Sequence, residues 1–259
     1  MSTLELEHLK HTSSSSNNLS VHSDGSLTLG MLQGNVGIGT ASPTVKLEAV
    51  GDIKASVSAA NAQISAITAG ASNYATFTAT NGSRSYSMQI RPDQSNSFAI
   101  RDETGGGNRL LIDTAGRVTK PNTPAFKFGV VTRNATGSDR IISTNNGDSF
   151  NYQTRDTHNV GSHFSTTTGR FTCPVAGTYL FYCSLMRNGT NGTVLENRIK
   201  KNGSLIYARA YADGYTASYE QSMLVTTTVC AVNDYIEFFV QGTTSMYQDD
   251  TYLGGYLLG

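Results

Sequence analysis

A glycine-rich segment near the start of the chain, Asn35–Pro43, constrains the fold more than any other part of the sequence. The segment continues to residue 53, and its apolar residues recur at steady spacing: Val36, Ile38, Val45, Leu47, Val50 and Ile53. A stretch this short and this rich in glycine cannot bury a core of its own, because small β-structures need a partner surface in water. The sequence therefore predicts a stem that becomes stable only when sister chains pack together.

The overall composition favours strands and turns over helices. Ser, Thr, Asn and Gly are abundant, Trp is absent, and 13 Tyr and 10 Phe supply the large apolar groups. Thr and Tyr favour strands, whereas Gly and Asn favour tight turns. No convincing helical periodicity is visible, so an all-β protein is predicted. A length of 259 residues is enough for one or two domains.

Charge and hydropathy exclude several classes of function. Only 15% of the residues are charged and the formal net charge is zero, whereas nucleic-acid binders of the electrostatic kind show a basic excess. No apolar run reaches membrane-spanning length, and no basic start followed by an apolar stretch indicates a secretory signal. We therefore expect no nucleic-acid partner, no membrane insertion and no export by the usual route.

Three cysteines, Cys173, Cys183 and Cys230, lie in strand-like apolar surroundings. Their odd number and their setting favour buried thiols that act as small hydrophobic groups. A single disulfide with one thiol left over is the alternative.

The first half of the chain is expected to contain two parts. Residues 1–33 include few apolar positions and a serine run, so alone they should be weakly ordered and should attach to a partner or intertwine with sister chains. Residues 34–123 are expected to form a β-rich shaft. Within it, three stretches with period-two alternation predict a small β-meander, with Asn81-Gly82 as a primed hairpin turn. The stretch Arg109–Pro121 partly repeats the earlier pattern and predicts a second short stem at 109–123.

The last part of the chain, residues 124–259, has longer strands and more apolar residues. Strand-like runs alternate with Asn-Gly, Asn-Asp and Gly-rich turns, which predicts a β-sandwich or jelly roll with its own core. Phe171, Tyr179 and Phe181 recur at even spacing, so we expect one face of a sheet to bury them. A side chain at Gly177 is expected to obstruct a turn or a close approach.

Two resemblances refine this picture. The stem at 35–53 resembles the stem repeat of phage tail fibres and related surface adhesins. The run Phe171–Phe181, with Phe164 and Asn159 before it, resembles the signature of the complement C1q globular-head family, a group of tumour-necrosis-factor-like jelly rolls. The pattern differs at Gln153, for which Tyr152 or Phe150 is a substitute, and at Cys183, where the family has an aromatic residue. The resemblance covers 124–259 and implies a jelly-roll knob that associates as a trimer, with apolar residues of the inner sheet along the threefold axis.

No catalytic residue, cofactor or metal site is predicted. Gly105-Gly106-Gly107 lacks the Lys-Ser/Thr of a phosphate-binding loop, and His158 and His163 lack a third ligand nearby. Asp249 and Asp250 could hold a cation but fit a solvated turn better. Exposed tyrosines beside carboxylates suit carbohydrate or protein surfaces, and we expect Tyr207 and Tyr219 to pack in the sandwich instead. The receptor-binding candidates are Tyr211, Asp213, Tyr215, Tyr247, Asp249 and Asp250; ordinary strand-edge tyrosines are the alternative.

Together these features predict an all-β homotrimer with a fibrous shaft and a C-terminal jelly-roll β-sandwich. The function expected is that of a bacteriophage tail fibre in the virion, attached to a baseplate or tail protein through its N-terminus. Its knob is expected to bind a host surface receptor, a polysaccharide. A bacterial surface adhesin or exoprotein structural module is one alternative. A polysaccharide-degrading tail spike is another, although paired acidic residues in a groove are not evident.

Overall fold

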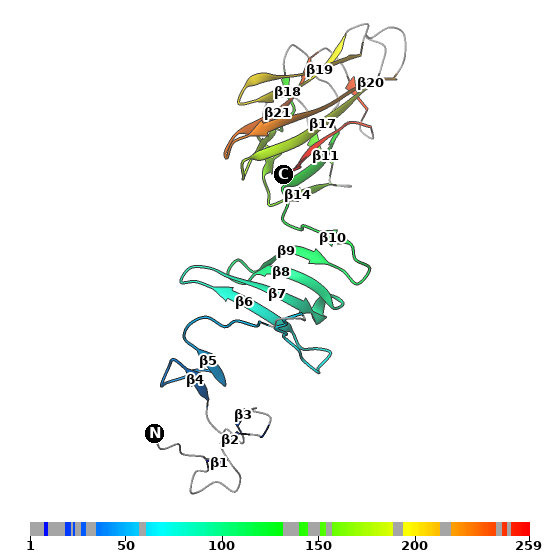
Figure 1. Ribbon diagram of the computed structural model, residues 1–259. Coiled ribbons are helices and arrows are strands. Elements are labelled where there is room, and N and C mark those ends of the chain that lie inside the picture. Colours follow the sequence, from blue (N-terminus) through cyan, green and yellow to red (C-terminus); the bar gives the residue numbers. More distant parts are fainter. Residues whose placement is uncertain are drawn as a thin grey trace. The chain divides into compact units, whose positions relative to one another are not determined.

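The computed structural model describes residues 8–9, 19–21, 23, 27–29, 35–56, 61–131, 140–144, 151–153, 157–188, 194–212, 219–241, 245–247 and 250–259. These residues are almost entirely strands and turns, with one short 3-10 turn, η1 (Pro92–Gln94), so the all-β prediction is confirmed. The chain divides into two units, residues 1–65 and residues 66–259 (Figure 1). The expected domain bounds of 1–33, 34–123 and 124–259 stay a prediction.

The first unit contains two very small sheets. Strands β1 (His8–Leu9), β2 (Leu19–Val21) and β3 (Leu27–Leu29) form an antiparallel sheet. Strands β4 (Val36–Ile38) and β5 (Leu47–Ala49) form a parallel pair in which Val36 lies opposite Leu47. The pair leaves the stem's large apolar side chains in contact with solvent, since Ile38, Leu47, Val50 and Ile53 are 60–71% exposed. The stem thus has strand geometry but no interior within one chain.

The second unit begins with a five-stranded antiparallel meander. Its strands run in the order β10-β9-β8-β7-β6. They are β6 (Ala75–Thr80), β7 (Ser85–Arg91), β8 (Ser97–Asp102), β9 (Gly107–Ile112) and β10 (Val118–Thr119). The three predicted strands are present as β6 to β8. The prediction of a second stem at 109–123 is wrong, because β9 and β10 extend the same sheet, with Ile100 opposite Leu110 and Ile112 opposite Val118.

The turn between β6 and β7 differs from the predicted primed hairpin. Thr80 pairs with Ser85, so the loop has four residues, and Gly82 is not in a left-handed conformation. The Asn81 side chain explains the longer loop, because its Oδ1 accepts hydrogen bonds from the backbone N–H groups of Ser83 (2.9 Å) and Arg84 (2.8 Å). An Asx turn has therefore replaced the two-residue turn.

The meander has an inverted pattern of burial. Along β7 the apolar residues Tyr86, Met88 and Ile90 are exposed, whereas Ser87, Gln89 and Arg91 on the alternate face are buried. Cross-strand register continues both faces, with Phe77 opposite Met88 on the apolar face and Thr76 opposite Gln89 on the polar face. In an antiparallel sheet with one solvated face, the polar side chains lie on that face and the apolar side chains pack against the core. An apolar face left open over several strands indicates a missing partner.

Residues from 125 onward form a β-sandwich of two sheets. The seven-stranded sheet has the order β13-β11-β23-β17-β20, with β14 beside β11 and β22 beside β17. Its strands are β11 (Ala125–Val131), β13 (Asn151–Tyr152), β14 (His158–Val160), β17 (Gly177–Asn188), β20 (Tyr219–Cys230), β22 (Ser245–Met246) and β23 (Tyr252–Leu257). The last strand of the chain, β23, therefore pairs with β11 on one side and with β17 on the other.

The six-stranded sheet has the order β15-β16-β21-β18-β19, with β12 beside β21. Its strands are β12 (Arg140–Ile141), β15 (Phe164–Ser165), β16 (Arg170–Thr172), β18 (Leu195–Lys201), β19 (Ser204–Ala212) and β21 (Tyr235–Gln241). Strands β18 and β19 are joined at Asn202-Gly203, where both residues have positive φ and Lys201 pairs with Ser204. This two-residue turn is of the primed kind that Asn-Gly favours.

Stacked aromatic rings fill the space between the two sheets. Phe126 of β11 lies 4.8 Å from Phe164 and 4.7 Å from Phe171, measured between ring centroids. Tyr179 and Phe181 of β17 meet Phe171 at 5.7 Å each. The expectation that one face of one sheet buries Phe171, Tyr179 and Phe181 is wrong, because Phe171 belongs to the facing sheet. The three residues meet across the sandwich.

Two signature positions have clear structural roles. Asn159 closes the turn between β14 and β15, since its amide donates to the Phe164 carbonyl (2.8 Å) and its Oδ1 accepts from the Phe164 N–H (3.1 Å). Tyr152 stands edge-on to Phe128 and Phe164, so it takes the aromatic place that Gln153 leaves empty, whereas Phe150 lies outside the described residues. Gly177 also behaves as predicted, because a Cβ there would meet Leu257 Cδ1 at 2.7 Å.

The three cysteines are buried free thiols, as predicted. Burial raises the pKa of the Cys183 thiol above its ordinary range. Cys183 occupies the position where the C1q pattern has an aromatic residue, and its backbone carbonyl accepts a hydrogen bond from the Asn197 amide of the facing sheet (2.8 Å). The same amide donates to the Ser222 carbonyl (3.2 Å). One buried side chain therefore ties β18 to both β17 and β20.

A carboxylate at the end of the sandwich is expected to make stability depend on pH. Asp234 accepts hydrogen bonds from the Asn202 side chain (2.7 Å) and the Ala231 N–H (2.8 Å), and it pairs with Lys201 (2.9 Å). The hydrogen bond from Asn202, together with these other partners, lowers the pKa of Asp234 to about 2. A lowered folded-state pKa stabilises the fold above the unfolded value near 4 and loses that contribution as pH falls towards 2.

The measurement compares the chain with its Asp234→Asn variant by guanidinium unfolding at several pH values. We expect the original chain to be more stable at pH 6 and the difference to shrink between pH 4 and pH 2. A difference of equal size at pH 6 and pH 2 would contradict the assignment.

Candidate functional site

The two outer faces of the sandwich differ sharply in chemistry. On the seven-stranded sheet, β20 points alternate residues to solvent, and three of the large ones are Met223, Val225 and Val229, 55–70% exposed. The register places Tyr182 opposite Val225 and Leu180 opposite both Thr227 and Tyr256. We call the set on this face the knob face; it comprises Leu180, Tyr182, Met223, Val225, Val229 and Tyr256.

Glycine makes room for a tyrosine at the centre of the knob face. A Cβ on Gly254 would lie 2.3 Å from Tyr182 Oη, so only glycine lets the Tyr182 ring lie across the last strand. Tyr182 and Tyr252 stand edge-on with ring centroids 6.1 Å apart. Burial, together with the nearby Tyr252 and Tyr256, raises the pKa of Tyr182 and keeps its hydroxyl neutral. The result is a mainly apolar and aromatic surface, with Lys127 as a charged group on the same face, where its ammonium lies 5.8 Å from the centre of the Tyr252 ring.

The outer face of the six-stranded sheet carries paired charges instead. Arg198 and Arg209 both bind Glu196, at 2.5 and 2.9 Å. Arg170 binds Glu237 at 2.9 Å on the same sheet. The two outer faces therefore differ in kind: one carries ion pairs, and the other exposes large apolar side chains to solvent.

Three of the six predicted receptor-binding residues lie within the described part of the chain. Tyr211 is exposed at the end of β19, and its hydroxyl accepts a hydrogen bond from Arg209 (2.9 Å). Tyr247 follows β22 and stands edge-on to Tyr219 at 5.5 Å. Asp250 is exposed just before β23. Asp213, Tyr215 and Asp249 lie outside the described residues.

The structure brings Tyr247 against Tyr219 and leaves Tyr211 on the charged face. The prediction that Tyr219 packs inside the sandwich is wrong, since it is 52% exposed at the start of β20. The side chain of Tyr207 lies outside the described residues. In the described part of the chain, no hydrogen bond or ring contact joins Tyr211 to Tyr247. The alternation of β20 was the available signal, because it places Tyr219 on the same face as Met223 and Val225.

The sequence of the sandwich matches a known protein family. The family model described as C1q domain matches residues 135–258. This part of the chain is a C1q-like domain. Its jelly-roll sandwich, with the Asn159 clamp and the Phe171–Phe181 contact, is a C1q/TNF-like fold. Strand β11 precedes the matched residues but pairs with β23 and supplies Phe126 to the core, so it belongs to the same sandwich.

Solved structures of low sequence identity are also similar. The globular domain of zebrafish complement 1qA shares 17% identity with a TM-score of 0.37, covering 52% of this chain and 98% of that one. Murine APRIL shares 10% identity with a TM-score of 0.38, covering 52% and 99%. Eiger TNF from S. frugiperda shares 13% with a TM-score of 0.36, covering 53% and 94%.

The described residues hold no group of three or more His, Cys, Asp or Glu side chains placed to bind a metal ion. Gly105–Gly107 lie at the loop between β8 and β9, where the Gly105 N–H donates to Asp102 Oδ1 (2.7 Å). C1q/TNF-like domains are typically binding modules rather than enzymes. None of the described helices has both the length and the apolar character needed to cross a membrane.

Proposed function

We propose that the chain is a homotrimeric bacteriophage tail fibre that attaches the virion to its host through the C1q-like domain. The observation that carries this proposal is the inverted burial of the meander. In one chain the apolar side chains Tyr86, Met88 and Ile90 face solvent while polar residues of the same strand are buried. Identical neighbours that bring their apolar faces together would remove this surface from water.

The stem and the C1q-like domain also leave apolar side chains exposed to solvent. Stem residues such as Leu47 and Ile53 are exposed by 61% and 71%, and the knob face exposes Val225 and Met223. Fully burying one large aliphatic side chain stabilises an assembly by about 1.5–3 kcal/mol. C1q/TNF-like domains are often trimeric receptor-binding modules. A trimer of this chain would cover the apolar face of the meander, the stem and the knob face through the same threefold symmetry.

The mechanism of attachment follows from the number of copies. Residues 1–33 bind a baseplate or tail protein, and the C1q-like domain contacts a host surface polysaccharide. Each contact can be weak while the particle as a whole binds tightly, because after the first contact the others form at high effective concentration. The paired charges on the six-stranded sheet stay at the outside of such a trimer, where they keep it soluble.

An antibody against the C1q-like domain tests the proposal on particles from lysates that contain the chain. We expect gold label on virion tails and slower adsorption of the phage to its host. Label on the surface of uninfected bacteria, with none on virions, would overturn the proposal in favour of a cellular adhesin. Shortening of host polysaccharide by the purified protein would replace it with a degrading tail spike.

The predicted receptor-binding residues have a separate test. The full chain carrying Asp213→Ala and Tyr215→Ala, or Tyr211→Ala and Asp250→Ala, is expected to bind host cells at least tenfold less well. Arg117→Ala, at an exposed position of the meander, serves as the control. If both paired variants bind as the original does, the receptor site lies elsewhere, although the fibre assignment stands.

A further inference from the structure

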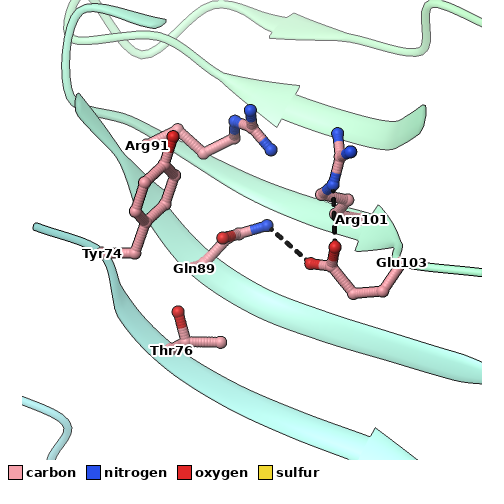
Figure 2. A pocket seen from close by; sticks show the side chains of 6 residues that line it. All are labelled: Tyr74, Thr76, Gln89, Arg91, Arg101 and Glu103. Atoms are coloured by element: carbon pink, nitrogen blue, oxygen red, sulfur yellow. Dashed lines mark hydrogen bonds and ion pairs between the residues drawn. The ribbon is translucent and has the colours of Figure 1, made fainter. Parts of the chain in front are cut away.

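The polar face of the meander carries a hollow of about 390 Å³ that the fibre assignment does not use. Its volume lies within the range of small-molecule sites, about 300–1,000 Å³. Figure 2 shows its side chains arranged around one space above β6, β7 and β8. The lining residues are Tyr74, Thr76, Gln89, Arg91, Arg101 and Glu103.

Strand register places the two arginines at opposite ends of the hollow. Ser87 lies opposite Arg101, Gln89 opposite Ala99, and Arg91 opposite Ser97, so all three pairs share one face. Ala99, between the two arginines on this face, is fully buried, so Gln89 rather than Ala99 lines the hollow there. Because neighbouring strands fix this spacing, the two guanidinium groups are held on a rigid support.

The side chains around the hollow are held in place by one another. Glu103 accepts hydrogen bonds from Ser87 (2.5 Å), Gln89 (3.0 Å) and Arg101 Nε (3.0 Å). The Ser87 hydroxyl, with these other donors, lowers the pKa of Glu103 and keeps it ionised. Arg91 binds Asp93 through Nε (3.1 Å) and a terminal nitrogen (2.5 Å). The site is therefore preorganised before any ligand arrives.

Several polar atoms facing the hollow have no protein partner in the described part of the chain. They are both terminal nitrogens of Arg101, one terminal nitrogen of Arg91, the Gln89 carbonyl oxygen and the Thr76 hydroxyl. Donors and acceptors are thus both available, on planar groups that can bind two neighbouring hydroxyls at once. Tyr74 adds a half-exposed aromatic ring at the edge, with the Arg91 guanidinium 5.6 Å from its centre.

The charges of the hollow decide between an anion and a neutral ligand. Arg91 is balanced by Asp93 and Arg101 by Glu103, so the site has no net positive charge to attract an anion. Balanced charges, free donors and acceptors, and an aromatic face match a ligand rich in hydroxyl groups. We propose that this hollow binds a neutral sugar residue, with Arg101, Gln89 and Thr76 on its hydroxyls and Tyr74 against its ring.

The position of the hollow keeps it accessible in an assembly. The exposed apolar side chains of Phe77, Met88 and Ile90 lie on the opposite face of the same sheet, so trimerisation through that face leaves the hollow open. The sugar site does not depend on the tail-fibre proposal or on the receptor residues of the C1q-like domain. A failure of one therefore does not imply a failure of the other.

The test uses saturation-transfer NMR on the full chain with separate neutral monosaccharides: glucose, galactose, mannose, rhamnose and N-acetylglucosamine. Glucuronate and inorganic sulfate provide the anion arms. We expect at least one neutral sugar to bind, and Arg101→Ala and Tyr74→Ala each to weaken it by tenfold or more. Arg117→Ala is the matched control, since Arg117 lies outside the hollow and is expected to leave binding unchanged.

Three results would each overturn the proposal. They are the absence of binding for every neutral sugar, binding of glucuronate or sulfate alone, and neutral-sugar binding that survives both Arg101→Ala and Tyr74→Ala in a chain that also carries the receptor-site changes Tyr211→Ala and Asp250→Ala. Amide exchange in β7 and β8 reports whether the variants still fold. If Arg101→Ala disturbs the sheet, Gln89→Glu replaces it. That change is small, but it introduces a second carboxylate beside Glu103 and is expected to abolish sugar binding.

Discussion

The full chain carrying Met88→Asp and Val225→Asp is expected to scatter light as a single 27.7 kDa polypeptide, whereas the original chain scatters at about three times that mass. Met88 is 51% exposed on the meander and Val225 is 55% exposed on the knob face, so neither supports the fold of one chain. In the proposed trimer, identical neighbours would cover both side chains. Carboxylates there are desolvated, unpaired and close to like charges, and each costs several kcal/mol of association.

The matched control adds the same two charges elsewhere. Asn96→Asp changes an exposed turn with positive φ that Asp tolerates, and Val194→Asp changes an exposed residue just before β18. This variant is expected to stay trimeric. Single-chain mass for the original protein across micromolar concentrations would remove the trimer, and dissociation of the control variant would mean that net charge rather than position is responsible.

Phe126→Ala is expected to give the largest loss of stability from a single core substitution. Phe126 is fully buried and stacks on Phe164 and Phe171, linking both sheets of the C1q-like domain. Truncation of a buried phenylalanine costs about 3–5 kcal/mol, because transfer free energy is lost and a cavity remains. Amide exchange in β17 and β20, followed by mass spectrometry, should accelerate by roughly 10²–10⁴-fold.

Phe239→Ala provides the comparison for Phe126→Ala. Phe239 lies on the outer face of the six-stranded sheet, half-buried beneath Lys200, so its removal leaves no enclosed cavity. We expect a much smaller acceleration of exchange. Equal effects of the two substitutions would show that the aromatic stack at Phe126 is not the centre of the fold.

Local chemistry predicted strands and turns more reliably than the exact kind of turn. Alternation located β6 to β8, and Asn202-Gly203 forms a turn between two strands, as predicted. Asn81-Gly82 also lies in a turn but does not form the predicted primed hairpin, because the Asn81 side chain bonds the backbone of the next residues and widens the loop. The dipeptide alone does not distinguish these outcomes, since the competing hydrogen bonds depend on the residues that follow it.

Sheet membership was harder to predict because it depends on contacts between distant segments. Even spacing predicts that Phe171 and Phe181 face the core, which they do, but it cannot say that they approach it from opposite sheets. The hollow was missed for the same reason. Arg91 and Arg101 lie at polar positions of two alternating strands, and only the pairing of β7 with β8 shows that they share a face.

The place of β23 between β11 and β17 has a consequence for the order of folding. Strand β23 hydrogen-bonds to two strands that lie far from it in the sequence, so it takes its place only after long segments of the chain have been brought together. A chain without Tyr252–Leu257 would leave the facing edges of β11 and β17 unpaired in the middle of the sheet. Closure of the seven-stranded sheet is therefore expected to be a slow step of folding, set by chain topology rather than by local strand propensity.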